Sequence, residues 1–389
     1  MQSKNIYIRE FRIMKKNFVR SLSAAVLFTL LTGTLAGCNA NASTNEPSVS
    51  TSDTESSTDA SATTTTTTTE ASTQEPASSA PADTSSASGE ERTDINIAVM
   101  TGPTAIGLVK VMKDNEDTAA ANNYNFQVFG EATEISTGLI KGELDAACVP
   151  CNLASVLYNK TEGGIVVAGI NTLGVLYIVE TGDTIHSVSD LAGKTIYTTG
   201  QGTTPEYTLR YILSGNGINP DSDVTIEFKS EAAEVVSALS ENPDAIAMLP
   251  QPYVTVAMNN NDTLHIALDI TEEWEKLDSD STVITGVVVA RKEWADAHSD
   301  AFNEFLSEYP ESAAFTNDNI EEAAELIEHF GIFKAAIAKK AIPYCNVTFI
   351  SGDEMKSKIS SYLNVLYEQN PASVGGALPG DDFYYMTEK

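Results

Sequence analysis

The sequence is poor in positive charge and in the residues that most often carry chemistry. Lysine and arginine number 23 against 54 aspartate and glutamate residues, so the formal net charge of the 389-residue chain is −31. This excess of negative charge makes nucleic acid and anionic lipid surfaces poor partners. The four histidines are scattered, and none has the spacing to another histidine or to a cysteine that a zinc site needs. We therefore expect no nucleic-acid partner, no metal and no cofactor.

Sequence motifs of nucleotide binding and of nucleophilic catalysis are also missing. The chain has no P-loop, no nucleophile elbow and no strand-linked GxGxxG motif. Cys148 and Cys151 have the CxxC spacing of a redox or metal site, but no second pair and no nearby histidine accompany them. Cys148 falls in an apolar run and is interpreted as a small core residue. We expect no catalytic residue, and whether Cys148, Cys151 and Cys345 form any disulfide stays open.

The first 37 residues differ from the rest in charge, with six basic residues and one glutamate against a net charge of −36 for the remainder. From Met14 a basic segment leads into an apolar run that is too short and interrupted for a comfortable membrane span. This pattern predicts a signal peptide over residues 1–37, starting at Met1 or Met14. The following Leu35-Ala36-Gly37-Cys38 resembles the lipobox of bacterial lipoproteins. The resemblance implies that the Cys38 thiol is acylated and anchors the protein to the cell membrane on its extracytoplasmic face.

Residues 38–93 consist mainly of serine, threonine, alanine, glutamate and proline, and they include an unbroken threonine run over 63–69. With almost no large apolar residues, this segment cannot bury enough surface to offset its chain entropy. Its composition predicts a disordered tether that holds a folded body away from the membrane. A sugar-bearing stalk would have the same mechanical role.

From residue 94 onward, apolar strand-like runs alternate with helical patterns joined by short connections. Strands are expected over 95–100, 124–129, 146–149, 165–169, 174–179, 195–198, 224–228, 245–249, 264–270 and 283–290. Helices are expected over 105–113, 131–142, 152–158, 204–213, 232–240, 294–306, 320–330 and 355–366, and another begins near 250–253. This alternation predicts an α/β fold with parallel sheets covered by helices on both faces.

Ligands of such sheets bind beyond the carboxyl ends of the strands, where polar loops begin helices. The turn at Thr101–Thr104 and the loop at Gly200–Pro205 each lead into a helix whose unpaired backbone N–H groups can form a ligand cradle. Thr204 can cap the second helix, and Pro205 suits its first turn. The candidate ligand-binding residues are Thr101, Gly102, Pro103, Thr104, Pro150, Asn152, Asn171, Thr172, Gln201, Gly202, Thr203, Thr204, Tyr207, Gln251 and Tyr253.

Several segments, in order and at similar spacing, resemble the solute-binding proteins of ABC importers over about residues 94–366. The likeness is to the nitrate, sulfonate, taurine and pyrimidine-precursor group of periplasmic binding proteins. Residues 189–196, SDLAGKTI, resemble that family's DLKGKKI segment, which enters its second lobe. The other matching segments are 101–103, 138–145, 202–205 and 249–253. Leu249 precedes a proline where the family often has an acidic residue.

This resemblance implies a type II periplasmic-binding-protein fold, with two α/β lobes joined by two hinge strands and a ligand cleft between them. Lobe one would comprise residues 94–181 and 283–389, and lobe two residues 182–282. The hinge strands would cross near 179–181 and 284–286. The implied partners are a small-molecule solute and an ABC permease with its ATPase, and the protein would be a monomer without enzymatic activity.

The loop residues bear on the class of solute. Two helix N-termini facing one cleft suit a small anion such as a sulfonate, whereas Tyr207 and Tyr253 with amide side chains suit a flat heterocycle. We favour a heteroaromatic or other nitrogenous nutrient, such as a pyrimidine or vitamin precursor, over an aliphatic sulfonate. The alternatives are an enzyme on the same fold, of the pyrimidine-precursor or menaquinone-pathway type, and a surface sensor. Such an enzyme would need a reactive cleft residue, for which only Cys151 qualifies by position.

Overall fold

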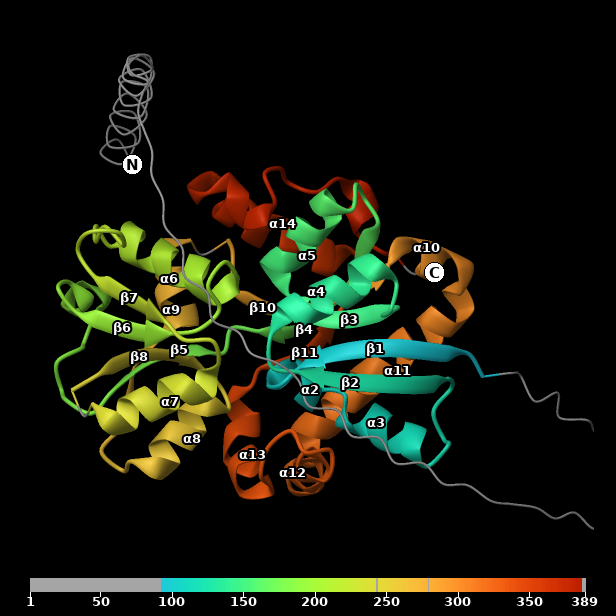
Figure 1. Ribbon diagram of the computed structural model, residues 1–389, viewed down its shortest axis with the longest axis horizontal. Helices are drawn as coiled ribbons and strands as arrows, with labels where there is room; N and C mark the ends of the chain where they lie inside the picture. The colour runs from blue at the N-terminus through green and yellow to red at the C-terminus, as the bar shows by residue number, and fades with distance from the viewer. Residues whose placement is uncertain (1–91, 243, 279, 387–389) are drawn as a thin grey trace, which may run out of the picture. The chain divides into compact units, whose positions relative to one another are not determined.

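The computed structural model describes residues 92–242, 244–278 and 280–386 (Figure 1). All described residues belong to one compact unit. The predicted signal peptide, Cys38 and nearly all of the predicted tether lie outside the described residues. No helix within the described ranges has the length and apolar character needed to cross a membrane.

Two β-sheets form the framework. The first sheet has the strand order β11-β4-β10-β3-β1-β2, and the second has the order β7-β6-β8-β5-β9. The strands of the first sheet are β1 (Asp94–Met100), β2 (Asn123–Phe129), β3 (Ala146–Pro150), β4 (Ile165–Leu173), β10 (Ile284–Arg291) and β11 (Val347–Ile350). The strands of the second sheet are β5 (Leu176–Glu180), β6 (Thr195–Thr198), β7 (Thr225–Phe228), β8 (Ile246–Pro250) and β9 (His265–Asp269).

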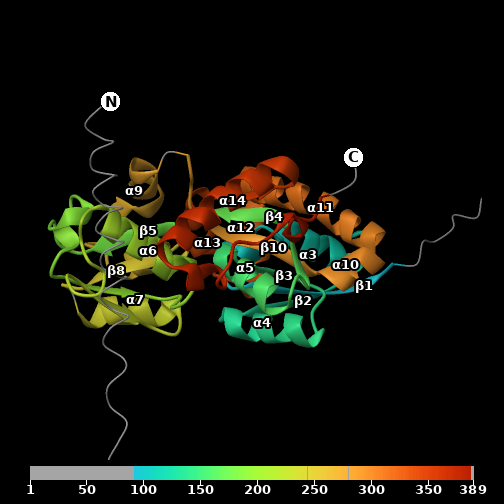
Figure 2. The same cartoon turned by 90° about the horizontal axis from the view of Figure 1, so that it is seen from above.

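Helices cover both faces of each sheet, as the alternating pattern predicts. In Figure 1, α6 and α9 lie on one side of the second sheet and α7 and α8 on the other, and Figure 2 shows α9 and α7 on opposite sides. The helices are α2 (Pro103–Ile106), α3 (Val109–Glu116), α4 (Ala132–Lys141), α5 (Cys151–Lys160), α6 (Thr204–Gly215), α7 (Ala232–Glu241), α8 (Tyr253–Asn260), α9 (Ile270–Leu277), α10 (Lys292–Ala297), α11 (Ser299–Asp318), α12 (Ile320–His329), α13 (Ala335–Ala341) and α14 (Gly352–Gln369).

The prediction of purely parallel sheets is wrong, because both sheets are mixed. β1 pairs in parallel with β2 and β3, but β10 runs antiparallel to β3 and β4. In the second sheet β5 runs antiparallel to β8 and β9. Two of the antiparallel strands join the sheets, since β5 follows β4 directly and β10 returns to the first sheet after α9, and β11 is a third, antiparallel to β4. The first crossing therefore lies at Gly174–Val175, earlier in the chain than the 179–181 that the resemblance implied.

The single helix predicted over 105–113 is also wrong, because two short helices, α2 and α3, stand there. The break falls at Gly107 and at Leu108, whose φ of −106° and ψ of 0° leave the helical region. A Cβ on Gly107 would lie 2.9 Å from Cγ1 of Val347 and 3.7 Å from the ring of Tyr309. The chain bends where β11 and α11 pack closely against it, and Ile106 and Leu108 are both fully buried there.

Buried side chains tie the two sheets and their helices into one body. The indole of Trp274 in α9 packs against the rings of Tyr211 and Tyr362, at centroid distances of 4.2 and 5.3 Å. Tyr362 belongs to α14, near the C-terminus, and its hydroxyl lies 3.3 Å from that of Thr208 in α6. Burial of these large aromatic side chains is a main source of stabilisation where the helices of the second sheet meet the C-terminal helix.

Candidate binding cavity

A cavity of about 730 Å³ lies where loops from both sheets meet, a volume typical of sites for small molecules. It opens beyond the carboxyl ends of β1, β2, β3, β6, β7 and β8, the edge at which α/β sheets bind their ligands. Its lining residues are Met100, Thr101, Pro103, Thr104, Gly130, Glu131, Ala132, Thr133, Pro150, Val175, Leu176, Thr199, Gly200, Gln201, Thr203, Thr204, Pro205, Phe228, Lys229, Ser230, Glu231, Ala232, Pro250, Tyr253 and Thr285.

The structure brings together about half of the residues predicted from the sequence. Those that line the cavity are Thr101, Pro103, Thr104, Pro150, Gln201, Thr203, Thr204 and Tyr253. Those that do not line it are Gly102, Asn152, Asn171, Thr172, Gly202, Tyr207 and Gln251. The loops were therefore placed correctly at the cavity, while direct contact of each residue with a ligand stays a prediction.

Two of the predicted amide side chains hydrogen-bond to the protein itself. Asn152 is fully buried, and its amide donates to the carbonyl oxygens of Ser373 at 2.9 Å and Gly202 at 3.3 Å. Its carbonyl accepts from the hydroxyl of Thr204 at 3.3 Å, so Asn152 links α5 to the start of α6. The Gln251 side-chain oxygen accepts from the hydroxyl of Thr255 at 2.8 Å and stabilises the first turn of α8.

Asn171 and Thr172 lie beneath the cavity lining rather than in it. Both are buried, and neither amide atom of Asn171 nor the hydroxyl of Thr172 has a hydrogen-bond partner. Thr285 lines the cavity beside them, and its hydroxyl oxygen is likewise buried and unpartnered. A β-bulge places Thr285, since Ile284 pairs with Leu173 and residue 286 with Thr172. Bulges often re-aim a side chain next to a functional site.

Three charged residues line the cavity that were not predicted from the sequence: Glu131, Lys229 and Glu231. They follow β2 and β7, two strands whose carboxyl ends had not been considered as ligand loops. A signal existed in the form of an internal repeat with an offset of 100 residues. Residues 130–134, Gly-Glu-Ala-Thr-Glu, correspond to residues 230–234, Ser-Glu-Ala-Ala-Glu, and each segment begins a helix after a strand.

Aromatic and basic side chains at the cavity are held by neighbours. The ring of Tyr253 packs edge-on against Phe333 at a centroid distance of 5.2 Å, and burial raises the pKa of its phenol, which therefore stays a hydrogen-bond donor. The Lys229 ammonium lies 3.6 Å from a carboxylate oxygen of Glu227 and 5.2 Å from the ring centroid of Tyr197. The basic side chain at the cavity thus already has an anionic partner.

The three cysteines of the described residues, Cys148, Cys151 and Cys345, are free thiols in the core. Burial raises the pKa of Cys148 and of Cys345 to about 12, and it raises that of Cys151 further. Cys151 does not line the cavity, so it is no exposed nucleophile of the kind that an enzyme on this fold would need. No cluster of histidine, cysteine and carboxylate side chains suited to a metal ion occurs within the described ranges.

Two α/β lobes with a cavity between their loops define a periplasmic binding protein, which confirms the predicted fold. Residues 113–341 match the family described as "ABC transporter, phosphonate, periplasmic substrate-binding protein", and the chain belongs to this family. No curated protein matches the chain.

Solved structures of similar fold cover almost all of the described body. An ABC transporter protein from Parabacteroides distasonis is 24% identical with a TM-score of 0.64, covering 76% of this chain and 100% of its own. The periplasmic aliphatic sulphonate binding protein SsuA from Escherichia coli is 15% identical with a TM-score of 0.61, covering 77% and 95%. The alkanesulfonate-binding protein SsuA from Xanthomonas axonopodis pv. citri, bound to MOPS, is 12% identical with a TM-score of 0.59, covering 75% and 96%.

Proposed function

We propose that this substrate-binding protein captures a small nutrient in the cavity and delivers it to the permease and ATPase of an ABC importer. It does so as a monomer, anchored to the extracytoplasmic face of the cell membrane through Cys38. The observation that carries the proposal is the cavity itself, which has the volume of a small-molecule site and is lined from both sheets. A ligand that contacts both lobes favours the closed arrangement by population shift, and the membrane partner can then recognise that form.

The solute that the lining fits best is a flat nitrogenous heterocycle, such as a pyrimidine or vitamin precursor. Phe228 and Tyr253 offer ring faces, and hydroxyls of several threonines with the amide of Gln201 offer hydrogen bonds to ring nitrogens and exocyclic groups. No arginine is among the lining residues. The bidentate arginine contact that phosphate-like groups commonly attract is therefore missing from the described cavity.

Thermal unfolding of the purified protein tests this proposal against a panel of pyrimidines, vitamins, amino acids, aliphatic sulfonates and phosphonates. A true ligand at a hundred times its dissociation constant stabilises the folded state by about 2.7 kcal/mol and raises the melting temperature. We expect a heterocycle to do so and Tyr253→Ala to reduce the shift. If no compound changes the melting temperature, the proposal of solute capture is contradicted; a shift with sulfonates alone contradicts only the ligand class.

A further inference from the structure

We infer that the cavity selects a solute that carries a protonated amine and rejects anions, because the chain's own carboxylates stand at the starts of α4, α6 and α7, three of the helices that begin at the cavity. The inference rests on the proposed function and names the charge of its ligand. It departs from the expectation that two helix N-termini would attract a sulfonate. It also sets this chain apart from the phosphonate in the family's description and from the sulfonate-binding structures named above.

The start of α6 shows the first such carboxylate. Glu206, in the first turn of this helix, accepts the backbone N–H of Gly202 at 2.7 Å. Its other oxygen accepts from Nε of Arg210 at 2.7 Å, which fixes the carboxylate in place. A backbone donor just before this helix is thus already bound to a carboxylate of the chain.

The starts of α4 and α7 repeat the arrangement in the two halves of the internal repeat. Glu131 and Glu231 occupy the residue before each helix, and both line the cavity. A carboxylate at this position interacts favourably with the positive end of the helix dipole. A Cβ added to Gly130 would lie 2.8 Å from an oxygen of Glu231, so Glu231 reaches the segment that begins α4. Both helix ends therefore face carboxylates of the chain itself.

The charges of the residues that line the cavity then determine whether a cationic or an anionic ligand is favoured. Two carboxylates, Glu131 and Glu231, face the cavity, and the ammonium of Lys229 is shared with Glu227 and the ring of Tyr197. An anion entering the cavity would lose its hydration and meet like charge. A protonated amine would instead form charge-assisted hydrogen bonds, which are about twice as strong as neutral ones.

The polar groups beneath the lining point independently to a ligand. Asn171 is only 1% exposed and both of its amide atoms lack partners, as does the buried hydroxyl of Thr285, which lines the cavity. Buried polar atoms without partners are costly, so such a cluster at a cavity normally meets a hydrogen-bonding group. Gly286 leaves room for Asn171 here, since a Cβ would lie 2.5 Å from the amide oxygen. The hydroxyl of Thr285, the member of this group that lines the cavity, meets the ligand's neutral polar edge while the ligand's amine meets Glu131 and Glu231.

Matched compounds on one ring test the inference: 4-aminomethylpyridine, 4-hydroxymethylpyridine, pyridine-4-carboxylate and 4-pyridinemethanesulfonate, measured by calorimetry beside the best ligand of the thermal panel. We expect the amine to bind at least tenfold more tightly than the alcohol, with the two anions weaker still. We also expect Glu131→Gln and Glu231→Gln each to weaken amine binding about tenfold or more. Glu134→Gln is the matched control, because it removes a carboxylate from the same first turn of α4 but does not line the cavity.

The outcomes separate the two proposals. Tighter binding of an anion than of the amine, or equal loss in Glu134→Gln and Glu131→Gln, overturns the inference while solute capture stands. Absence of binding by every compound of both panels overturns the proposed function, and the inference with it. Retained melting temperatures of the glutamine variants without ligand show that a loss of binding is not a loss of folding.

Discussion

Glu180 shows at the scale of one residue how a buried charge is stabilised at the end of β5 that lies away from the crossing between the sheets. Its carboxylate, at the end of β5, accepts the backbone N–H groups of Thr184 and Ile185, both at 2.8 Å, and the hydroxyl of Thr184 at 2.7 Å. Burial alone raises the pKa of this carboxyl, but these hydrogen bonds outweigh it and the pKa lies below the ordinary value. Glu180 therefore contributes stability above the pKa it has in the unfolded chain.

We expect Glu180→Gln to lower the free energy of unfolding at pH 7 by about 1–3 kcal/mol, because hydrogen bonds to the charged group are lost. The contribution of Glu180 disappears as the pH falls through its lowered pKa in the folded state, so the difference should narrow at a pH below the ordinary pKa of a glutamate. Urea unfolding of the wild-type protein and of Glu180→Gln at both pH values measures this difference in the free energy of unfolding. A difference that does not change with pH would show that the charge of Glu180 is not the cause.

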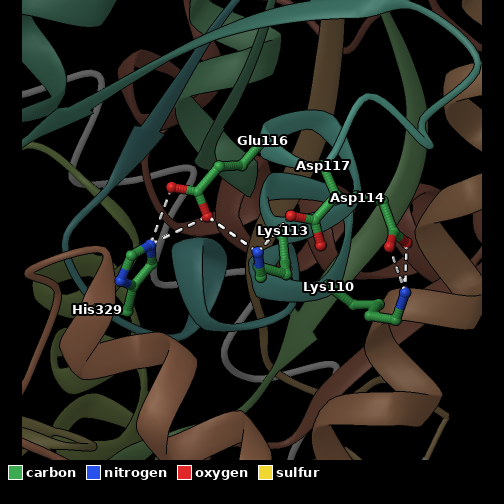
Figure 3. A network of polar contacts seen from close by, with 6 residues as sticks. All are labelled: Lys110, Lys113, Asp114, Glu116, Asp117 and His329. Atoms are coloured by element: carbon green, nitrogen blue, oxygen red, sulfur yellow. Dashed lines mark hydrogen bonds and ion pairs between the residues drawn. The ribbon is translucent and has the colours of Figure 1, made fainter.

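Glu116 is the matched control for this measurement because it is an exposed carboxylate in a surface network (Figure 3). Both of its oxygens lie 3.1 Å from Nε2 of His329 and one lies 3.2 Å from the Lys113 ammonium. The hydrogen bonds from His329 and Lys113 lower the pKa of Glu116. Exposed pairs contribute little to stability, so Glu116→Gln should change the unfolding free energy far less than Glu180→Gln.

At the scale of secondary structure elements, local pattern predicted most strands but not their partners. Residues 195–198 were predicted as a strand and form β6, because their alternation is local. The antiparallel direction of β10 could not be predicted, since it depends on where the chain returns from the second sheet. The cavity residues also differ in whether a local signal was enough to predict them. Thr101–Thr104 was recognised from its own turn residues. Glu131 and Glu231 required the comparison of two segments 100 residues apart.

The break between α2 and α3 depends on a contact with β11, which lies 240 residues further along the chain, and it is testable. Gly107→Ala places a methyl group 2.9 Å from Cγ1 of Val347, and both the branched side chain and the adjacent Tyr309 limit relaxation. We expect the free energy of unfolding to fall by about 1–3 kcal/mol, as for other overpacked cores. The second substitution Val347→Ala should make the effect of Gly107→Ala smaller in a double-mutant cycle. Additive effects of the two substitutions would contradict this account of the break.

At the scale of the whole molecule, the proposed attachment to the membrane can be tested separately from solute binding by the folded body. Within the described ranges no helix is suited to span a bilayer. The strong net negative charge of the chain also gives it no electrostatic attraction to anionic lipids. The proposed attachment is a lipid on Cys38, which lies outside the described residues.

Cys38→Ser should therefore move the protein from the membrane fraction to the soluble extracytoplasmic fraction, because serine lacks the thiol that would carry the lipid. The melting temperature of the body and its shift with ligand should stay unchanged, since the substitution lies far from the cavity in sequence. Fractionation of cells that express either form measures the first effect, and thermal unfolding the second. As a control, Cys345→Ser alters a buried thiol of the folded body and should leave the protein on the membrane. Membrane retention of the Cys38→Ser form would show that another segment or partner holds the protein there.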